Sequence, residues 1–326
     1  METLSLGTSG LLTSRLGFGL AAVGRPSYIN LGRPLDLGSD RRPEILRALA
    51  HRLLDVAYAG GVRYFDAARS YGRAEEYLAS WLASRQPMPD PVTCGSKWGY
   101  TYVGNWSMNP SLHEVKDHSL AALRRQFRES SSILGATLQL YQVHSATLES
   151  GVLTNSQVLR ELLRLRQEGL SIGLTVSGLR QSEVIHKALA IRVDGFNPFS
   201  TVQATWNLLE PSVGEALEAA HEAGWGVLVK EALANGRLLQ IQNPRLEPLL
   251  DLARRRSVGP DVVALAAALA QPFVDTVLLG SVTPAQLRSN LKAIEVALTV
   301  DELLEMAELK QSPESYWEDR GRLSWS

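Results

Sequence analysis

The sequence predicts an α/β fold: a single (β/α)8 TIM barrel with an N-terminal β-hairpin and a C-terminal tail. Short apolar runs alternate along the chain with amphipathic helical stretches, which is the pattern of βα units and of a parallel sheet. We count eight such apolar runs, the number of strands in a barrel of this kind. The chain has 326 residues and 45% hydrophobic content, which is enough to bury a large core in one domain.

Each element is expected from a local signal. Turn residues at 7–10 separate two apolar pieces of the segment 4–17 and predict a hairpin that closes one end of the barrel. The expected strands are 16–21, 62–66, 92–97, 138–144, 171–176, 201–205, 225–230 and 276–280. The expected helices are 43–59, 73–85, 113–132, 155–168, 181–190, 212–223, 260–270 and 284–297. No repeat or low-complexity linker divides residues 1–326, so we expect one domain, with long irregular segments at 25–42, 98–112 and 310–326.

The composition argues against several classes of partner. The 33 basic and 34 acidic residues nearly cancel, which gives no electrostatic reason to expect nucleic acid or an anionic membrane. The one cysteine, Cys94, cannot form an intrachain disulfide, so we expect a reduced, cytoplasmic setting. No signal peptide opens the chain, and the stretch VVALAAALA is much shorter than the ~20 residues that a spanning helix needs.

Polar side chains lie at the ends of three consecutive predicted strands. Asp66 ends one strand, and Tyr71 follows five residues later in RYFDAARSYG. Lys97 ends the run VTCGSK, and His144 closes LQLYQVH. In a barrel these strand ends meet at one face, where such folds collect their catalytic residues. A tyrosine near a carboxylate can donate a proton once a cation lowers its pKa from about 10, and Lys97 is the candidate cation.

These four residues, in this order, resemble the catalytic tetrad of the aldo-keto reductase superfamily. The resemblance extends over residues 16–294. It implies NAD(P)H-dependent reduction of an aldehyde, ketone or sugar carbonyl, or the reverse oxidation of an alcohol. Tyr71 would protonate the carbonyl oxygen and His144 would orient it. Lys97, paired with Asp66, would favour the tyrosinate form.

The same resemblance implies a nicotinamide cofactor. The stretch VLLGSVTPAQLRSN offers a helix N-terminus after the eighth strand, which is a ready phosphate site. The residues expected around the adenosine 2′-phosphate are Gly280, Ser281, Thr283, Gln286 and Asn290. NADP(H) is therefore expected. NAD(H) stays open, because Gly280 and Gln286 stand where many family members carry Lys and Arg.

Other strand ends are expected to hold the rest of this cofactor. The resemblance places Ser177 and Gln203 at the nicotinamide carboxamide and Trp206 on the face of the nicotinamide ring. The loop KEALANGRL resembles a pyrophosphate loop, with Leu233 and Gly236 as its matching residues. Glu231 replaces a smaller residue there, and no role follows for it from the sequence.

The substrate itself is less visible than the cofactor. The segment 98–112 is expected to line the substrate pocket through Trp98, Tyr100 and Trp106, together with the C-terminal tail. No HExxH or paired-ligand spacing occurs, so no metal site is expected. Two other functions remain compatible with the sequence. One is a nicotinamide-binding regulatory or scaffold subunit, and the other is a barrel lyase that uses Lys97 as a Schiff base.

Overall fold

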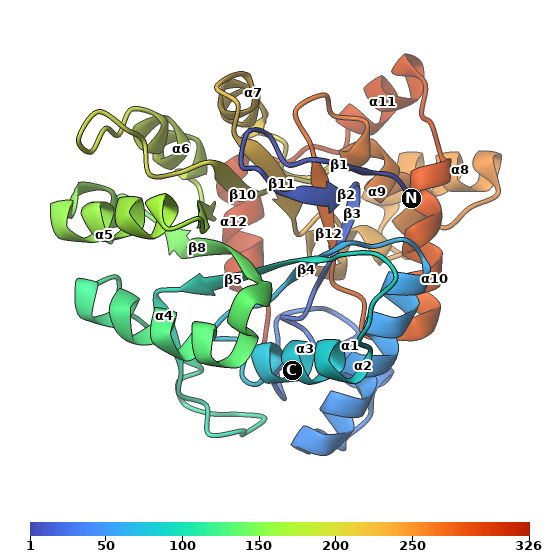
Figure 1. The fold of residues 1–326 in the computed structure, drawn as a ribbon. Helices are drawn as coiled ribbons and strands as arrows, with labels where there is room; N and C mark the ends of the chain where they lie inside the picture. Colours follow the sequence, from blue (N-terminus) through green and yellow to red (C-terminus); the bar gives the residue numbers. More distant parts are fainter.

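A closed barrel of eight parallel strands forms the centre of the molecule (Figure 1). The structure is a computed structural model that describes residues 1–326. In order around the barrel the strands are β3 (Leu16–Gly19), β4 (Tyr64–Asp66), β5 (Thr93–Trp98), β8 (Leu138–Ala146), β9 (Ser171–Val176), β10 (Thr201–Thr205), β11 (Gly226–Lys230) and β12 (Thr276–Leu279). β12 pairs with β3 and closes the barrel. The predicted TIM barrel and all eight of its predicted strands are therefore confirmed.

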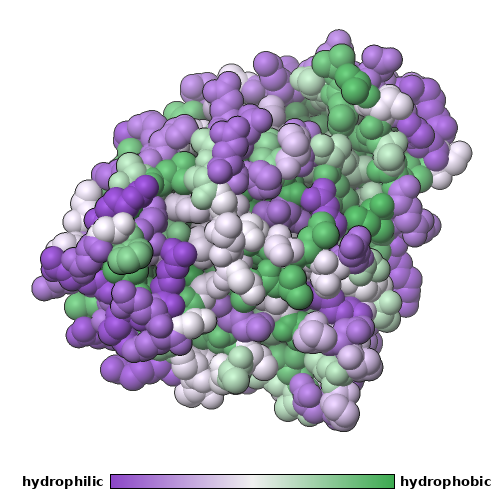
Figure 2. All heavy atoms as spheres, turned by 45° about the horizontal axis from the view of Figure 1, so that its top comes forward, coloured by the Kyte–Doolittle hydropathy of each residue, from purple (hydrophilic) through white to green (hydrophobic).

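Helices cover the outside of the barrel (Figure 1). Those that were expected from the sequence are α2 (Pro43–Ala59), α3 (Ala74–Ser84), α4 (Leu120–Leu134), α5 (Ser156–Gln167), α6 (Gln181–Leu189), α7 (Gly214–Glu222), α9 (Pro260–Leu269) and α10 (Pro284–Leu291). None of these or the other helices is long and apolar enough to cross a membrane. On the face drawn in Figure 2, hydrophobic residues are scattered among charged and polar ones.

Two predicted helices were too long. The helix expected at 113–132 begins only at Leu120, because β7 (Glu114–Lys116) pairs antiparallel with β6 (Tyr100–Tyr102). The side chain of Ser119 then caps α4 by accepting a hydrogen bond from the backbone N–H of Ala122, at 3.1 Å. The helix expected at 284–297 ends at Leu291 and tightens into the 3₁₀ turn η5 (Lys292–Glu295).

Several short elements were not predicted. They are the helices α1 (Arg33–Leu37), α8 (Glu247–Arg256), α11 (Val300–Ala307) and α12 (Pro313–Gly321) and the 3₁₀ turns η1 (Gly135–Thr137), η2 (Val152–Thr154), η3 (Ala234–Leu239) and η4 (Pro244–Leu246). The tail expected to be irregular thus contains a helix. Ser312 accepts a hydrogen bond from the backbone of Ser315 and Pro313 occupies the first turn, so the start of α12 carries an ordinary capping signal.

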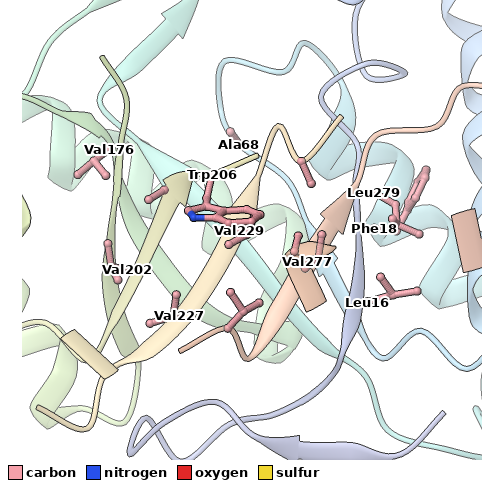
Figure 3. Close-up of a cluster of buried hydrophobic side chains, with 14 of the residues drawn as sticks. Leu16, Phe18, Ala68, Val176, Val202, Trp206, Val227, Val229, Val277 and Leu279 are labelled. Atoms are coloured by element: carbon pink, nitrogen blue, oxygen red, sulfur yellow. The ribbon is translucent and has the colours of Figure 1, made fainter. Parts of the chain in front are cut away.

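The barrel strands have two hydrophobic faces because successive side chains alternate. Val227 and Val229 belong to the main core between barrel and helices, whereas Leu228 between them belongs to a separate cluster inside the barrel. Figure 3 shows part of the outer layer, with Val202, Val229 and Val277 on neighbouring strands. The same alternation decides which polar residues face the interior.

The predicted N-terminal hairpin is confirmed, and it closes the end of the barrel at which the parallel strands begin. It consists of β1 (Thr3–Ser5) and β2 (Leu12–Ser14), which pair antiparallel. Leu6, at its turn, is fully buried against the interior cluster of Leu11, Tyr64, Leu140 and Leu228. Gly7 has a φ of +51°, and a Cβ there would lie 2.3 Å from the backbone nitrogen of Gly226, so only glycine fits this close approach.

We predict that Leu6→Ala destabilises the protein by about 2–5 kcal/mol, because it removes the side chain that fills the end of the barrel. Urea unfolding monitored by circular dichroism measures this change. Leu12→Ala is the matched control, because Leu12 lies in the same hairpin but is 55% exposed. If Leu6→Ala were no more destabilising than Leu12→Ala, the Leu6 side chain would not contribute to the stability of the core.

Candidate active site

The structure brings the four predicted catalytic residues together at the carboxyl end of the strands. Asp66 ends β4, Lys97 lies near the end of β5, and both side chains are almost completely buried. The ammonium of Lys97 donates to Asp66 Oδ2 and to the backbone carbonyl of Ala67, the latter at 2.9 Å. Tyr71 Oη lies 3.5 Å from Nε2 of His144. The four side chains therefore lie close together at one end of the barrel.

His144 lies at an irregular point of β8. The pairing register between β8 and β9 shifts between Val143 and Ala146, and Ser145 has a φ of +48°. The backbone N–H of Ser145 donates to Oγ1 of Thr175 at 2.7 Å, which stabilises this bulge. Bulges of this kind often redirect a side chain next to an active site.

Burial is the main cause of the shifted pKa values of Tyr71 and His144. It raises the pKa of Tyr71 well above 10, and Asp66 raises it further, whereas Arg25 acts in the opposite direction. Lys97 Nζ lies 4.7 Å from the centre of the Tyr71 ring, but its charge is compensated by Asp66. The net lowering of the Tyr71 pKa expected from the sequence is thus absent, and the phenol is protonated. Burial and nearby cations lower the pKa of His144 well below 6.5, so its imidazole is neutral.

The second carboxylate oxygen of Asp66 is held by three inward-facing side chains. Tyr64 Oη donates to Asp66 Oδ1 at 3.0 Å, and the amides of Gln142 and Gln203 lie 3.4 and 3.3 Å from it. The sequence analysis missed Tyr64 and Gln142. Each precedes a tetrad residue on its own strand by two positions, which is the spacing that places two side chains on the same face.

A pocket of about 500 Å³ runs from this site to the start of α10. At the catalytic end it is lined by Asp66, Tyr71 and Gln203. The predicted cofactor residues that line it elsewhere are Leu233, Gly236, Gly280, Ser281, Gln286 and Asn290. Three other predicted cofactor residues, Ser177, Trp206 and Thr283, do not line it.

The loop after β11 has a backbone shape suited to an anion. Glu231, Ala234 and Asn235 all have positive φ values, of 56°, 49° and 56°, and Gly236 follows with 91°. Positive φ is costly for residues other than glycine and is concentrated at functional sites, and turns of this type create concave anion sites from backbone N–H groups. Asn235 Oδ1 is buried without a hydrogen-bond partner, so an acceptor faces this pocket unused. The backbone N–H groups of Ala234 and Gly236 donate within the loop, to the carbonyls of Glu231 and Leu233 at 2.8 and 2.9 Å, so the loop offers the pocket its shape and the free acceptor of Asn235 rather than these donors.

Lys230 is a pocket residue that the sequence analysis missed. It ends β11 on the inward face, and its ammonium donates to Ser177 Oγ at 2.7 Å and to Thr205 Oγ1 at 2.6 Å. Burial lowers the pKa of Lys230 to about 8. Lys230 follows the inward-facing Leu228 by two positions, and this spacing was the sequence signal that could have placed it inside the barrel. Ser177, expected to contact the carboxamide, is engaged with this lysine.

Glu231, for which the sequence suggested no role, anchors the C-terminal helix. Its carboxylate accepts two hydrogen bonds from Arg320 of α12, at 2.8 and 2.5 Å. Although burial opposes ionisation, Arg320 and Lys230 hold the pKa of Glu231 at about 2. This pair connects the loop of the pocket to the tail of the chain.

The two tryptophans placed in the site by sequence lie elsewhere. Trp98 follows the inward-facing Lys97, so it points outward into the main core, where its ring meets the edge of His118 at 5.5 Å. Trp206 is also part of that core and is buried, as its position beside the outer-face valines in Figure 3 illustrates. These placements correct the expectations that Trp98 lines the substrate pocket and that Trp206 stacks on a nicotinamide ring.

The two other aromatic residues predicted for the substrate pocket differ in position. Tyr100 lies edge-on to His144, with ring centres 5.1 Å apart, and is therefore adjacent to the tetrad. Trp106 donates to the backbone carbonyl of Arg41 at 2.7 Å and has the guanidinium of Arg73 5.5 Å from its ring, so its contacts lie away from the tetrad.

Arg25 connects the tail with the tetrad and was not predicted. Its guanidinium lies 5.4 Å from the ring centre of Tyr71 and 4.6 Å from that of Trp325. It donates to the backbone carbonyl of Ser70 at 3.1 Å and to Glu114 at 2.9 Å. The segment that includes Arg25 and the end of the chain thus closes one side of the active site.

Comparison with known proteins gives a consistent result. The family model described as "Aldo/keto reductase family" matches residues 16–311. The chain is 24% identical to the uncharacterized oxidoreductase YrpG of Bacillus subtilis, over 97% of this chain and 99% of that protein. It is 23% identical to a D-threo-aldose 1-dehydrogenase of a Pseudomonas species, over 94% of this chain and 96% of that protein. The solved holo form of the aldo-keto reductase AKR11C1 from Bacillus halodurans has the same fold, with a TM-score of 0.71 and 23% identity over 96% of this chain and 97% of the other.

The ion pair between Glu231 and Arg320 predicts a specific pH dependence. Because the pKa of Glu231 is lowered to about 2, its stabilising contribution is complete above the ordinary glutamate pKa and is lost as the pH falls towards 2. We expect Glu231→Gln to cost about 1–3 kcal/mol at pH 7, since Arg320 is partly exposed. The difference from wild type should narrow by roughly 1 kcal/mol per pH unit below about pH 4.5.

Urea unfolding of both proteins between pH 7 and pH 3.5 measures this difference. Glu183→Gln serves as the control, because Glu183 forms an exposed pair with Arg180 and its loss should leave the stability nearly unchanged at every pH. A difference for Glu231→Gln that stays constant over this pH range would contradict the assignment.

Proposed function

The chain belongs to the aldo/keto reductase family and is an NAD(P)H-dependent oxidoreductase, and from this we propose that it reduces the carbonyl group of an aldehyde, ketone or sugar with Tyr71 as the general acid. The reverse oxidation of an alcohol uses the same residues. The observation that supports the proposal best is the position of Tyr71 Oη, 3.5 Å from His144 Nε2 at the end of a pocket that also contains Asp66.

The proposed mechanism follows from the charge that develops on the substrate. The bound nicotinamide supplies the two-electron chemistry at the carbonyl carbon. Negative charge then grows on the carbonyl oxygen, and Tyr71 donates its proton there. His144, neutral because its pKa is lowered, orients that oxygen through its Nε2. Burial keeps Tyr71 in the protonated form that the reduction needs.

The ion pair stabilises the product of this proton transfer. When Tyr71 loses its proton, the ammonium of Lys97, 4.7 Å from the centre of the Tyr71 ring, favours the anion. Asp66 compensates the buried ammonium in both states. A lysine held in this way is not a free amine, which disfavours the alternative of a Schiff-base lyase.

The pocket supports a nicotinamide cofactor along its length. We assign Gln203 to the nicotinamide end, the loop with Leu233 and Gly236 to the pyrophosphate, and Ser281 and Asn290 to the adenosine end. Thr283 acts indirectly, because its side chain caps α10. Both NAD(H) and NADP(H) are compatible with this general assignment.

The broader setting is also part of the proposal. We propose that residues 1–326 act as one domain in the cytoplasm, on a small carbonyl or alcohol substrate. The single closed barrel, with one large core between its strands and the surrounding helices, supports the single domain. The single cysteine, Cys94, is buried, which is compatible with a reducing compartment.

A screen of aldehydes, ketones and sugars for nicotinamide consumption, with both cofactors, tests this function. Turnover of at least one class is the expected result. Cofactor binding without any turnover would favour a regulatory or scaffold subunit. Borohydride trapping of a carbonyl compound in the absence of nicotinamide would favour the lyase.

We predict that Tyr71→Phe lowers kcat by about 10²–10⁴-fold and leaves the Kd of the reduced cofactor within about twofold, because only the proton donor is removed. Steady-state kinetics and calorimetric titration measure the two quantities. Tyr102→Phe is the matched control, since the Tyr102 hydroxyl accepts from the backbone of Trp106 away from the tetrad. Near wild-type turnover of Tyr71→Phe would exclude Tyr71 as the acid.

A further inference from the structure

The proposed function fixes the orientation of the cofactor in the pocket. The nicotinamide must reach the substrate beside Tyr71, so the opposite end, at α10, receives the adenosine half. This end is lined by Asp36, Gln286 and Asn290, among others. The charges and hydrogen-bonding groups at this end therefore decide between a ribose with a free 2′-hydroxyl and one with a 2′-phosphate.

The N-terminus of α10 has few donors to offer a phosphate. Thr283 Oγ1 accepts from the backbone N–H of Gln286 at 3.2 Å. In return, Gln286 Oε1 accepts from the backbone N–H groups of Val282 and Thr283 at 3.0 and 3.2 Å. Pro284, at the first helical position, has no N–H. This capping box uses the N–H groups of Val282, Thr283 and Gln286, so that of Ala285 is the one backbone donor left in the first turn.

Two carboxylates line the same end of the pocket. Asp36 Oδ2 accepts from the side-chain amide of Gln286 at 2.8 Å. Asp261 Oδ2 accepts from the side-chain amide of Asn290, also at 2.8 Å. The side-chain amides of Gln286 and Asn290 are thus bound to anions, and both anions face the pocket.

No cation offsets these carboxylates at this end of the pocket. The basic residues that line the pocket are Arg33 and Lys230. Arg33 makes four hydrogen bonds to backbone carbonyls, and Lys230, at the end of β11, donates to the hydroxyl groups of Ser177 and Thr205. Arg288 is exposed and does not line the pocket, although it lies on α10.

We infer that this chain binds NAD(H) in preference to NADP(H), and that Asp36 is the residue that discriminates between them. Its carboxylate can accept a hydrogen bond from a ribose hydroxyl, whereas it repels a phosphate at the same place. The expectation of NADP(H) from the sequence rested on Ser281, Thr283, Asn290 and the helix N-terminus as free donors. In the structure Ser281 donates to Asn290 Oδ1 at 2.6 Å, Asn290 donates to Asp261, and Thr283 Oγ1 caps the helix.

Calorimetric titration with NADH and with NADPH tests this inference without requiring turnover. We expect wild type to bind NADH at least roughly tenfold more tightly than NADPH, which corresponds to one repulsive charge interaction between Asp36 and the 2′-phosphate. Asp36→Asn should lower the ratio of the NADPH Kd to the NADH Kd about fivefold or more, mainly by tightening the binding of NADPH. Asp40→Asn is the matched control, because Asp40 is an exposed carboxylate of the same segment that pairs with Arg42 outside the pocket, and it should leave the ratio unchanged.

A double variant, Asp36→Asn with Gln286→Arg, should reverse the preference, because it replaces the carboxylate and adds a cation for the phosphate. Circular dichroism melting curves confirm that the variants are folded. Tighter binding of NADPH than of NADH by wild type would overturn the inference and leave the proposed function intact, and so would an unchanged ratio in Asp36→Asn. Failure of both cofactors to bind would overturn the proposed function and the inference with it.

Discussion

The buried ion pair between Asp66 and Lys97 is the interaction on which the rest of the site depends. Charges removed from water cost several kcal/mol each and persist only when both ions are well hydrogen-bonded. The second oxygen of Asp66 accepts from Tyr64, Gln142 and Gln203, which belong to three different barrel strands. The pair is therefore stable only in a closed barrel, and the barrel interior is organised around it.

The other charges near the site are compensated from outside the barrel strands. Arg25 pairs with Glu114, and Glu231 pairs with Arg320 of the C-terminal helix. Lys230 has only a distant carboxylate, Glu231 at 3.9 Å, which does not offset the burial that lowers its pKa to about 8. Hence the long segments that looked irregular in the sequence supply the counter-charges of the pocket, and they are structural parts of the site as much as the strands are.

The sequence predicted well what depends on local periodicity. All eight strands follow from short apolar runs between helical stretches, and Asp66 and Lys97 lie at the ends of two of these runs, along which side chains alternate with period two. The same period explains the errors at Trp98 and Trp206, because a residue adjacent to an inward-facing one must face the helices. A residue type that suits a role, such as an indole for stacking, thus carries no information about the face on which it lies.

Contacts between distant parts of the chain were beyond sequence analysis. The start of α10 was correctly predicted, but an isolated N-cap pattern cannot show that the helix donors are already satisfied by Gln286. Nor can it show that Asp36, 250 positions earlier, reaches this helix. A phosphate site requires free donors and a net positive field, and these are properties of the assembled pocket. We therefore propose that the motif at α10 marks the adenosine end of the pocket, and that the carboxylate of Asp36, which reaches it from α1, decides which form of the adenosine ribose is accepted.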